Sequence, residues 1–294
     1  MTTALIAGIT MTACTAAKQP PAPSTPSPER DHQAVLAALR ELDLCAVLDA
    51  GIEDTPVIPS VELRATEPFS CVADPSDEKA IDITIHEFGD RERAIYTRID
   101  LAGAEAYVSG PDQYCYVGLP VGSGLAIEVN GLWTPASERE CAPARDLGTA
   151  MVKALARPGD FSRTPMWDAC SALITARDDE ADYVPGGDSC AVKAGPTVRL
   201  EFSSAIGLAP DKNAVPETIG GRQARVKDPS PDSCYVSWNQ APLTTSHAVA
   251  PDYRATVTMR DCKQARPLAV AVMAVLDQPP PTDVAPQRPL FYPA

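Results

Sequence analysis

The nine cysteines constrain this 294-residue chain more than any other feature, because they divide into groups of one, four and four. Cys14 closes a short apolar stretch near the N-terminus. The other eight form two quartets: Cys45, Cys71, Cys115 and Cys141, then Cys170, Cys190, Cys234 and Cys262. In both quartets the second and third cysteines are 44 residues apart. An even set at repeated spacing indicates a disulfide framework, which forms in an oxidising compartment. We therefore expect an exported protein made by duplication of one stapled unit.

The N-terminal segment has the pattern of a lipoprotein signal. Residues 4–13 are mostly apolar, small residues stand just before Cys14, and the run is too short to span a membrane. The basic residues that normally open a signal peptide are missing. Either the true start lies upstream, or the segment is not a signal. We expect residues 1–14 to be a lipoprotein-type signal with lipidation at Cys14, which places the chain on the extracytoplasmic face of the cell membrane.

Composition divides the rest of the chain into four parts. Residues 15–30 are rich in proline and predict an extended tether that cannot bury a core. The first module is expected at 31–157 and the second at 158–277, and both lengths are ordinary for a domain. Residues 278–294 carry six further prolines and predict a disordered tail.

Both modules show the same predicted order of elements. Helical spacing predicts helices at 31–41 and 44–50, the second capped by Asp43, and Asp168 stands in the same place in the second module. Terminal helices are expected after Cys141 and from about Gln264. The predicted strands are 80–88, 94–99, 114–119 and 125–129, then 189–193, 197–202, 233–238 and 253–259.

Strands bracketed by helices, without regular βαβ alternation, indicate an α+β fold. We expect two tandem homologous modules, each a small antiparallel sheet with N- and C-terminal helices and two intra-module disulfides. Sequence alone leaves three connectivities for each quartet. We favour Cys45–Cys71 with Cys115–Cys141, and the corresponding Cys170–Cys190 with Cys234–Cys262. The main alternative joins Cys71 to Cys115 and Cys45 to Cys141.

Three short motifs occur once in each module. Asp-x-Cys opens a helix at 43–45 and 168–170, Gly-x-x-Ala precedes a Cys-Tyr-Val strand at 103–106 and 221–224, and Cys-x-x-Ala begins the terminal helix at 141–144 and 262–265. Together they resemble the actinobacterial DUF3558-type lipoproteins over roughly residues 40–277. The resemblance implies a secreted or surface-attached α+β module of unassigned biochemical function, without catalytic residues. The chain differs in having two copies, and in lacking the family's common Asp-Pro-Cys.

The catalytic motifs in the sequence are incomplete. Residues 187–190, Gly-Asp-Ser-Cys, resemble a trypsin-type nucleophile segment, but a cysteine replaces the required glycine. The three histidines, His32, His86 and His247, have no supporting motif. The Ser-x-x-Lys match at 76–79 lacks the companion motifs of penicillin-binding enzymes. We therefore expect no catalytic residue.

Metal-binding patterns are incomplete as well. The acidic residues at 178–182 lack the spacing and the glycine of a calcium loop, and we interpret them as a solvated loop. No two cysteines have the spacing of a zinc knuckle. We expect no metal and no cofactor.

Two tryptophans in predicted loops, Trp133 and Trp167, are the candidate partner contacts, because exposed tryptophans often anchor ligands or partners. Trp238 continues a predicted strand and is expected in the core. A net charge of −14 argues against nucleic acid as a partner. We expect a non-catalytic binding module of the cell envelope, attached to the membrane by its lipid and recognising an envelope protein or a small ligand. The alternative is a cell-wall hydrolase or transferase that uses carboxylates from several loops, and a cleft holding two or more acids of raised pKa would favour it.

Overall fold

The computed structural model describes most of the chain after the expected tether. The described residues are 30–56, 58, 61–74, 81–109, 115–122, 124–131, 141–157, 160–179, 181–193, 198–204, 213–230, 233–240 and 242–294. The predicted lipidation site Cys14 and the candidate contact Trp133 lie outside these residues. In the part of the chain that is described, no helix has the length and apolar character needed to cross a bilayer.

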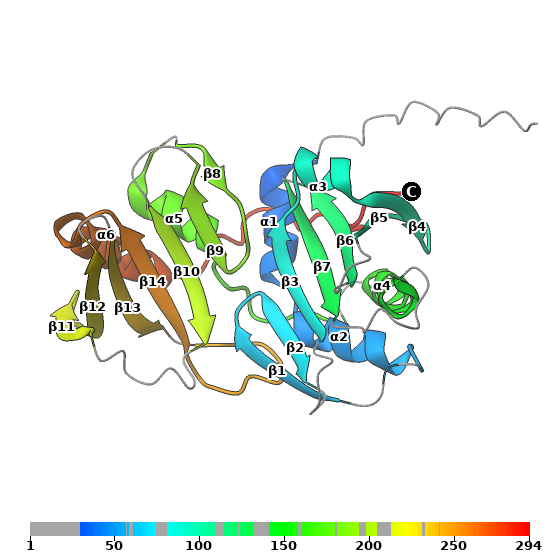
Figure 1. Ribbon diagram of the computed structural model, residues 1–294, viewed down its shortest axis with the longest axis horizontal. Helices are drawn as coiled ribbons and strands as arrows, with labels where there is room; N and C mark the ends of the chain where they lie inside the picture. The colour runs from blue at the N-terminus through cyan, green and yellow to red at the C-terminus, as the bar shows by residue number, and fades with distance from the viewer. Residues whose placement is uncertain are drawn as a thin grey trace, which may run out of the picture.

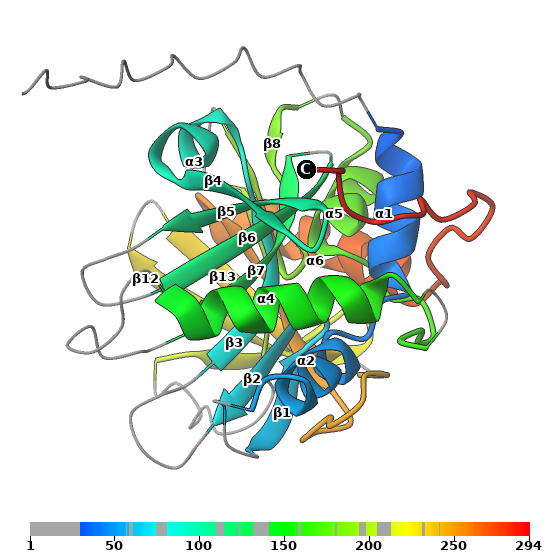
Figure 2. The ribbon, with the colours of Figure 1, turned by 90° about the vertical axis from the view of Figure 1, so that its right-hand side faces the viewer.

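The first module is built on a seven-stranded antiparallel sheet with strand order β1-β2-β3-β7-β6-β5-β4. Helices α2 and α4 pack together on one face of this sheet, and α4 runs across the strands in Figure 2. The element bounds are α2 Leu44–Glu53, β1 Glu62–Glu67, β2 Ser70–Asp74, β3 Ile81–Glu87, α3 Asp90–Ile95, β4 Thr97–Leu101, β5 Ala104–Ser109, β6 Cys115–Gly122, β7 Leu125–Gly131 and α4 Ala142–Leu155.

The second module repeats this topology strand for strand. Its sheet has the order β8-β9-β10-β14-β13-β12-β11, again antiparallel, and α5 and α6 pack together against it (Figure 1). The bounds are α5 Ala169–Arg177, β8 Tyr183–Val184, β9 Ser189–Val192, β10 Arg199–Ser204, β11 Val215–Ile219, β12 Arg222–Ser230, β13 Ser233–Gln240, β14 Tyr253–Met259 and α6 Cys262–Leu276. The structure is therefore α+β, with two antiparallel sheets and six helices among the described residues.

Four disulfides connect helices to strands within the modules. Each joins a cysteine at or near the start of a helix to one on a strand, and the pairs are Cys45–Cys71, Cys115–Cys141, Cys170–Cys190 and Cys234–Cys262. These are the favoured pairings, and the alternative between Cys71 and Cys115 does not occur. The bonds fasten both helices of each pair to the sheet that they cover.

Local sequence explains how the layers come together. Ile81, Ile83 and Ile85 alternate along β3 and are all buried, which gives the strand one apolar face. Helix α2 approaches α4 closely at Gly51, where a Cβ atom would lie 2.9 Å from side-chain atoms of both Leu147 and Met151. The glycine therefore allows the two helices to pack in contact.

The two modules share one continuous apolar core. Helix α1, His32–Arg40, lies between them in Figure 1 and is buried from Val35 to Arg40. The modules are therefore interlocked rather than joined by a free linker.

The segment after α6 is a correction to the sequence prediction. Residues 278–294 were expected to be disordered, but the segment returns to the first module, and Leu290, Phe291 and Tyr292 are buried. The backbone N–H of Glu105 in β5 donates to the carbonyl of Tyr292 at 2.9 Å. Apolar residues at its end give this proline-rich segment enough buried surface to be held in place.

Other predictions needed smaller corrections. Residues 94 and 95 end α3 rather than beginning a strand, and α6 begins at Cys262 with Asp261 as its N-cap, ahead of the expected start. Helix α3 and six strands were not predicted from the sequence: β1, β2, β5, β8, β11 and β12. Three of the sheet edges, β1, β4 and β11, carry charged or exposed residues, so their apolar alternation is weak.

Candidate functional site

The structure places the predicted contact Trp167 inside the protein, which corrects that prediction. The residue is 8% exposed, and its indole N–H donates to the carbonyl of Gln278 at 2.8 Å. The guanidinium of Arg40 lies 5.8 Å from the centre of its ring. Trp167 therefore packs α1 against the segment that follows α6. Trp238 is buried in β13, as expected.

The histidines and Ser189 do not come together in one site. His32 begins α1, His86 is exposed in β3, and His247 lies in the loop between β13 and β14. Ser189 is exposed at the start of β9 beside the Cys170–Cys190 disulfide. In the acidic loop, Asp179 accepts hydrogen bonds from Arg177 and Tyr183. Among the described residues, no group of three His, Cys, Asp or Glu side chains is arranged to hold a metal ion.

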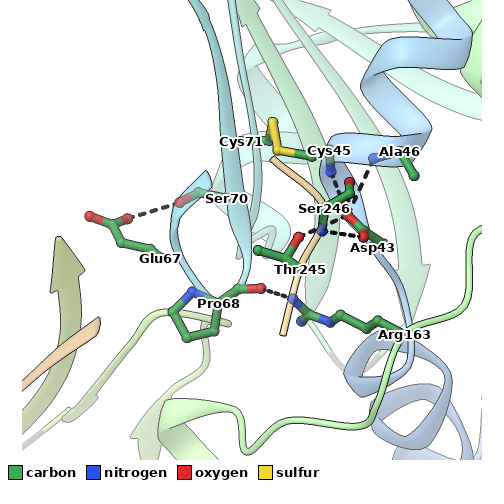
Figure 3. The surroundings of a disulfide bond; sticks show 10 residues. All are labelled: Asp43, Cys45, Ala46, Glu67, Pro68, Ser70, Cys71, Arg163, Thr245 and Ser246. Carbon is green, nitrogen blue, oxygen red and sulfur yellow. Dashed lines mark hydrogen bonds between the residues drawn. A yellow bond between two sulfur atoms is a disulfide. The ribbon is translucent and has the colours of Figure 1, made fainter. Parts of the chain in front are cut away.

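Asp43 joins the two modules at the Cys45–Cys71 disulfide (Figure 3). Its carboxylate caps α2 by accepting the backbone N–H groups of Cys45 and Ala46 at 3.1 and 3.2 Å. The same carboxylate accepts hydrogen bonds from the Thr245 hydroxyl at 2.8 Å and the Ser246 N–H at 2.6 Å, in the loop before β14. Although burial alone would raise the pKa of Asp43, the hydrogen bonds outweigh it and lower that pKa.

A second polar cluster lies at the same junction. Arg163 is buried, its guanidinium donates to the carbonyl of Pro68, and desolvation lowers its pKa to about 10 (Figure 3). Nearby, the carboxylate of Asp188 accepts the backbone N–H of Phe69 at 3.0 Å. Burial, followed by the charge of Glu67, raises the pKa of Asp188 well above its usual range, and burial also raises the pKa of Glu67. At the junction, the pKa of both acids is therefore raised, and the charge of Glu67 acts on Asp188.

A hollow lies on the second sheet. It has a volume of about 1040 Å³ and is lined by residues of β10, β12, β13 and β14, together with Ala214 and Pro216. The polar lining residues on these strands are Glu201, Ser203, Arg222, Gln223, Arg225, Lys227, Tyr235, Ser237, Asn239, Arg254, Thr256 and Thr258. We call this hollow the second-sheet pocket.

Cations outnumber acids in the second-sheet pocket. Its lining contains four basic side chains and one carboxylate, that of Glu201, which pairs with Arg199 at 3.6 Å. Arg222 donates to the amide oxygen of Gln240 at 2.8 Å and pairs with the carboxylate of Asp277 after α6, so its charge is already compensated. Within the described residues, Arg225 and Arg254 have no carboxylate partner. The pKa of Arg254 is lowered, first by burial and then by the charge of Arg225.

The corresponding face of the first sheet is filled by the protein itself. Strand pairing shows which residues of the two faces correspond. Gly118 and Ser237 each lie three positions after the strand cysteine of their module. Tyr107 pairs with Gly118 and Arg225 pairs with Ser237, so Tyr107 corresponds to Arg225. By the same pairing Ala126 corresponds to Arg254. The ring of Phe88 packs in one cluster with Tyr107 and Ala126, and a Cβ atom at Gly118 would lie 2.9 Å from that ring.

The first face also differs in charge. It carries Asp82 and Glu128, and burial raises the pKa of both, with Asp82 adding to the effect on Glu128. In the second sheet, Arg199 stands at the place of Asp82, and Thr256 at the place of Glu128. The two modules thus share a topology but present faces of different charge.

The second-sheet pocket was not predicted from the sequence. The signal was present in β13 and β14, where Tyr235, Ser237 and Asn239 alternate with buried residues, as do Arg254 and Thr256. Both strands were predicted, but no role was assigned to their polar faces. Which polar faces form a pocket depends on the neighbouring strands.

Comparison with known proteins identifies no relative. No protein-family model and no curated protein matches the chain. Among solved structures, the chain is similar to the immunity protein TplEi of T6SS from Pseudomonas aeruginosa, complexed with "L" peptide. That match has 8% identity, a TM-score of 0.28, and covers 74% of this chain and 97% of the other. At this TM-score the similarity carries no argument about fold or function.

Proposed function

We propose that this protein is a membrane-anchored extracytoplasmic lipoprotein that acts as a non-catalytic binding module of the cell envelope, with the second-sheet pocket as its binding site. The observation that supports this most is the composition of the pocket. Its lining offers hydroxyl, amide and basic groups across an open sheet face, and such convergent polar groups in a hollow suit ligand recognition.

The same lining favours binding over hydrolysis. Acid–base catalysis by carboxylates needs acids of suitable pKa beside the bound substrate. Among the described residues, the four acids of raised pKa are Glu67, Asp82, Glu128 and Asp188, and none of them lines the second-sheet pocket. Its own carboxylate, Glu201, is paired with Arg199.

The alternative function, a cell-wall hydrolase or transferase, draws its support from Glu67 and Asp188. These are two acids of raised pKa at the module junction, and the charge of Glu67 acts on Asp188. However, Asp188 accepts the backbone N–H of Phe69, so part of its hydrogen-bonding capacity serves the contact between modules. Loss of cell-wall-degrading activity in E67Q, with unchanged folding, would favour the enzyme over the binding module.

We further propose that the two modules are homologous and arose by duplication. Strand order, disulfide pairing and the placement of the Gly-x-x-Ala motifs all correspond between the two sheets. An unrelated pair of domains would need to share all three by coincidence. We also propose a relation to the DUF3558-type lipoproteins, as a two-copy member, on the short motifs that occur once in each module.

The location rests on Cys14 and on the disulfides, which persist in oxidising compartments. The test is metabolic labelling with palmitate, followed by membrane fractionation, of the natural chain and of Cys14→Ser. We expect the label and the membrane association to be lost in the variant, while the four disulfides remain. Equal labelling of both would remove the anchor from the proposal.

The type of partner is tested separately. Capture from solubilised membranes by the natural chain, with and without substitution of the pocket residue Arg254, distinguishes an envelope protein from a small ligand. A protein captured only by the chain with an intact pocket would make the partner an envelope protein.

A further inference from the structure

We propose that the first module has a binding site of its own, which takes an extended peptide along the first half of β5, and that residues 287–294 are the resident ligand of this site. We call these residues the C-terminal arm. The partner that fits is a peptide with large apolar or aromatic side chains followed by proline, as in Leu290 to Pro293 of the arm. This site is separate from the second-sheet pocket and goes beyond the proposed function.

The C-terminal arm joins the first sheet as an added strand. It passes α1 and ends beside β5 (Figure 1). The backbone N–H of Glu105 donates to the carbonyl of Tyr292 at 2.9 Å, and the N–H of Ala294 donates to the carbonyl of Gly103 at 3.0 Å. The two segments form an antiparallel bridge between these bonds. Such main-chain bonds do not depend on the side chains of the added strand, and sheet edges recognise peptides in this way.

An early end to the pairing of β5 with β6 leaves room for the arm. Within the described residues, this pairing covers 107–109 of β5. In the same register Glu105 would face Pro120, which has no N–H to donate, and β6 is irregular directly after that proline. In the second module the corresponding pairing runs one residue pair further, to Ala224 and Trp238. The first half of β5 therefore has an edge that an extended segment can fill.

Side chains of the arm add apolar contact to these bonds. Leu290 and Phe291 belong to the apolar core and are 2% and 7% exposed, and Tyr292 is buried beside them. Gly122 leaves room for the arm, because a Cβ atom there would lie 3.3 Å from the Tyr292 hydroxyl and 3.1 Å from Cδ of Arg30. Burial of large apolar side chains gives such a site its affinity for one kind of peptide.

Arg30 closes the site over the arm. Its guanidinium donates to the carbonyl groups of three successive residues, Pro289, Leu290 and Phe291. The same group lies 4.3 Å from the centre of the Tyr292 ring. The three hydrogen bonds recognise an extended main chain, and the contact with the ring favours an aromatic residue after it. Arg30 precedes α1, so this contact comes from outside the sheet.

The connection between α6 and the arm allows the arm to leave. Residues 279–286 contain four prolines, and within the described part of the chain their backbone groups make no hydrogen bond to another backbone group. When the arm detaches, β5 keeps its pairing with β4 and with residues 116–118 of β6. Segments held by few backbone bonds open without unfolding of the whole domain. A partner's peptide can then take the place of the arm.

The test uses the full chain with its site vacated by L290S/F291S, and a fluorescent peptide of the natural sequence 286–294 followed by anisotropy. We expect the peptide to bind this variant at least about tenfold more tightly than the natural chain, whose site is filled. R30Q in the vacated chain should weaken binding at least about tenfold, because it removes the donor to three carbonyl groups. R91Q is the matched control, since Arg91 is exposed on α3, and it should leave binding unchanged.

Equal binding to the natural and vacated chains would overturn the inference, as would no binding to a vacated chain that keeps its four disulfides and its circular dichroism. If the vacated chain does not fold, hydrogen exchange in the natural chain decides. The Glu105 amide should exchange at least about a hundredfold faster than the amides of the central strand β7, and R30Q should accelerate it further, unlike R91Q. Equal exchange at Glu105 and β7 would show that the arm does not leave separately. The second-sheet pocket takes part in neither measurement, so this inference and the proposed function fail separately.

Discussion

Arg40 and Asp168 form a buried ion pair between the helix that precedes the first sheet and the first helix of the second module. Their side chains are 4% and 5% exposed, and the Nε–Oδ2 distance is 2.9 Å. Asp168 also caps α5 by accepting the N–H of Ser171, and Arg40 donates to the Ser171 hydroxyl. Asp43 is the equivalent N-cap of α2, and its carboxylate accepts hydrogen bonds from Thr245 and Ser246 of the second module. Each Asp-x-Cys aspartate therefore caps its own helix and fastens the opposite module.

We expect R40M to lower the free energy of unfolding by about 3–5 kcal/mol, because it leaves the Asp168 carboxylate buried without its cation. Urea denaturation measures the change. R64M is the matched control, since Arg64 and its partner Glu62 are exposed and their pair should contribute about 1 kcal/mol or less. A double variant with D168N should cost less than the sum of the single changes. Equal losses in R40M and R64M would contradict a structural role for the buried pair.

Asp43→Ala should destabilise the protein by about 2 kcal/mol or more, because it removes both the cap of α2 and the acceptor for Ser246. Asp43→Asn keeps a capping oxygen and should cost less. The lowered pKa of Asp43 sets the direction of its pH dependence. Its contribution is present above the unfolded pKa and is lost as pH falls through the folded pKa. Denaturation curves from pH 7 to pH 2 should therefore show an acid-induced loss that is smaller in the alanine variant.

Glu67 and Asp188 should have the opposite dependence on pH. Their pKa values are raised in the folded protein, so the folded state binds protons more readily than the unfolded chain. Their charged forms therefore cost stability as pH rises from the unfolded pKa through the folded pKa. We expect E67Q to flatten this loss, because it removes the like charge beside Asp188. Stability of E67Q and the natural protein measured from pH 4 to pH 8 tests this, and parallel curves would show that the two acids do not interact.

Removing one disulfide from each module should have similar effects. The Cys45–Cys71 and Cys170–Cys190 bonds close segments with sequence separations of 26 and 20. The loop-entropy argument gives about 3–4 kcal/mol for loops of this size. Thermal unfolding of C45A/C71A and C170A/C190A, with both variants confirmed by non-reducing peptide mapping, should show losses of comparable size. A map that joins Cys71 to Cys115 would contradict the pairing.

The C-terminal segment provides a prediction about the first sheet. Phe291→Ala removes a buried ring from the core and should cost about 3–5 kcal/mol if the segment unfolds together with the domain. Exposed Ile95, at the end of α3, is a matched control, because I95A removes apolar atoms that are largely in contact with water already. Hydrogen exchange at Glu105, whose N–H donates to the Tyr292 carbonyl, should accelerate in the Phe291 variant. Unchanged exchange there would show that the segment does not protect β5.

Local patterns in the sequence were enough to predict five of the six described helices and the cap of α2, and to favour the observed pairing of the cysteines, but not the helix α3 or the cap of α6. Asp43 caps α2 through residues two and three positions away, so its role depends on neighbours along the chain. The buried alternation of Ile81, Ile83 and Ile85 likewise predicts β3 without any knowledge of the rest of the fold. Each disulfide joins the first cysteine of a quartet to the second, or the third to the fourth. The repeated spacing indicated that both quartets have the same pairing.

Tertiary structure decided what depends on residues far apart in the chain. Edge strands such as β1 form because a neighbouring strand offers a hydrogen-bonding partner, although their own charged sequences indicate little. Phe291 is buried because the first module provides an apolar surface for it, and Trp167 is buried where α1 and the C-terminal segment meet. Arg225 and Arg254 line one pocket because β13 lies between their strands. The sequence by itself therefore determined much of the local conformation and favoured the observed disulfides, whereas the charge and shape of the pocket arise from contacts across the sheet that no local pattern encodes.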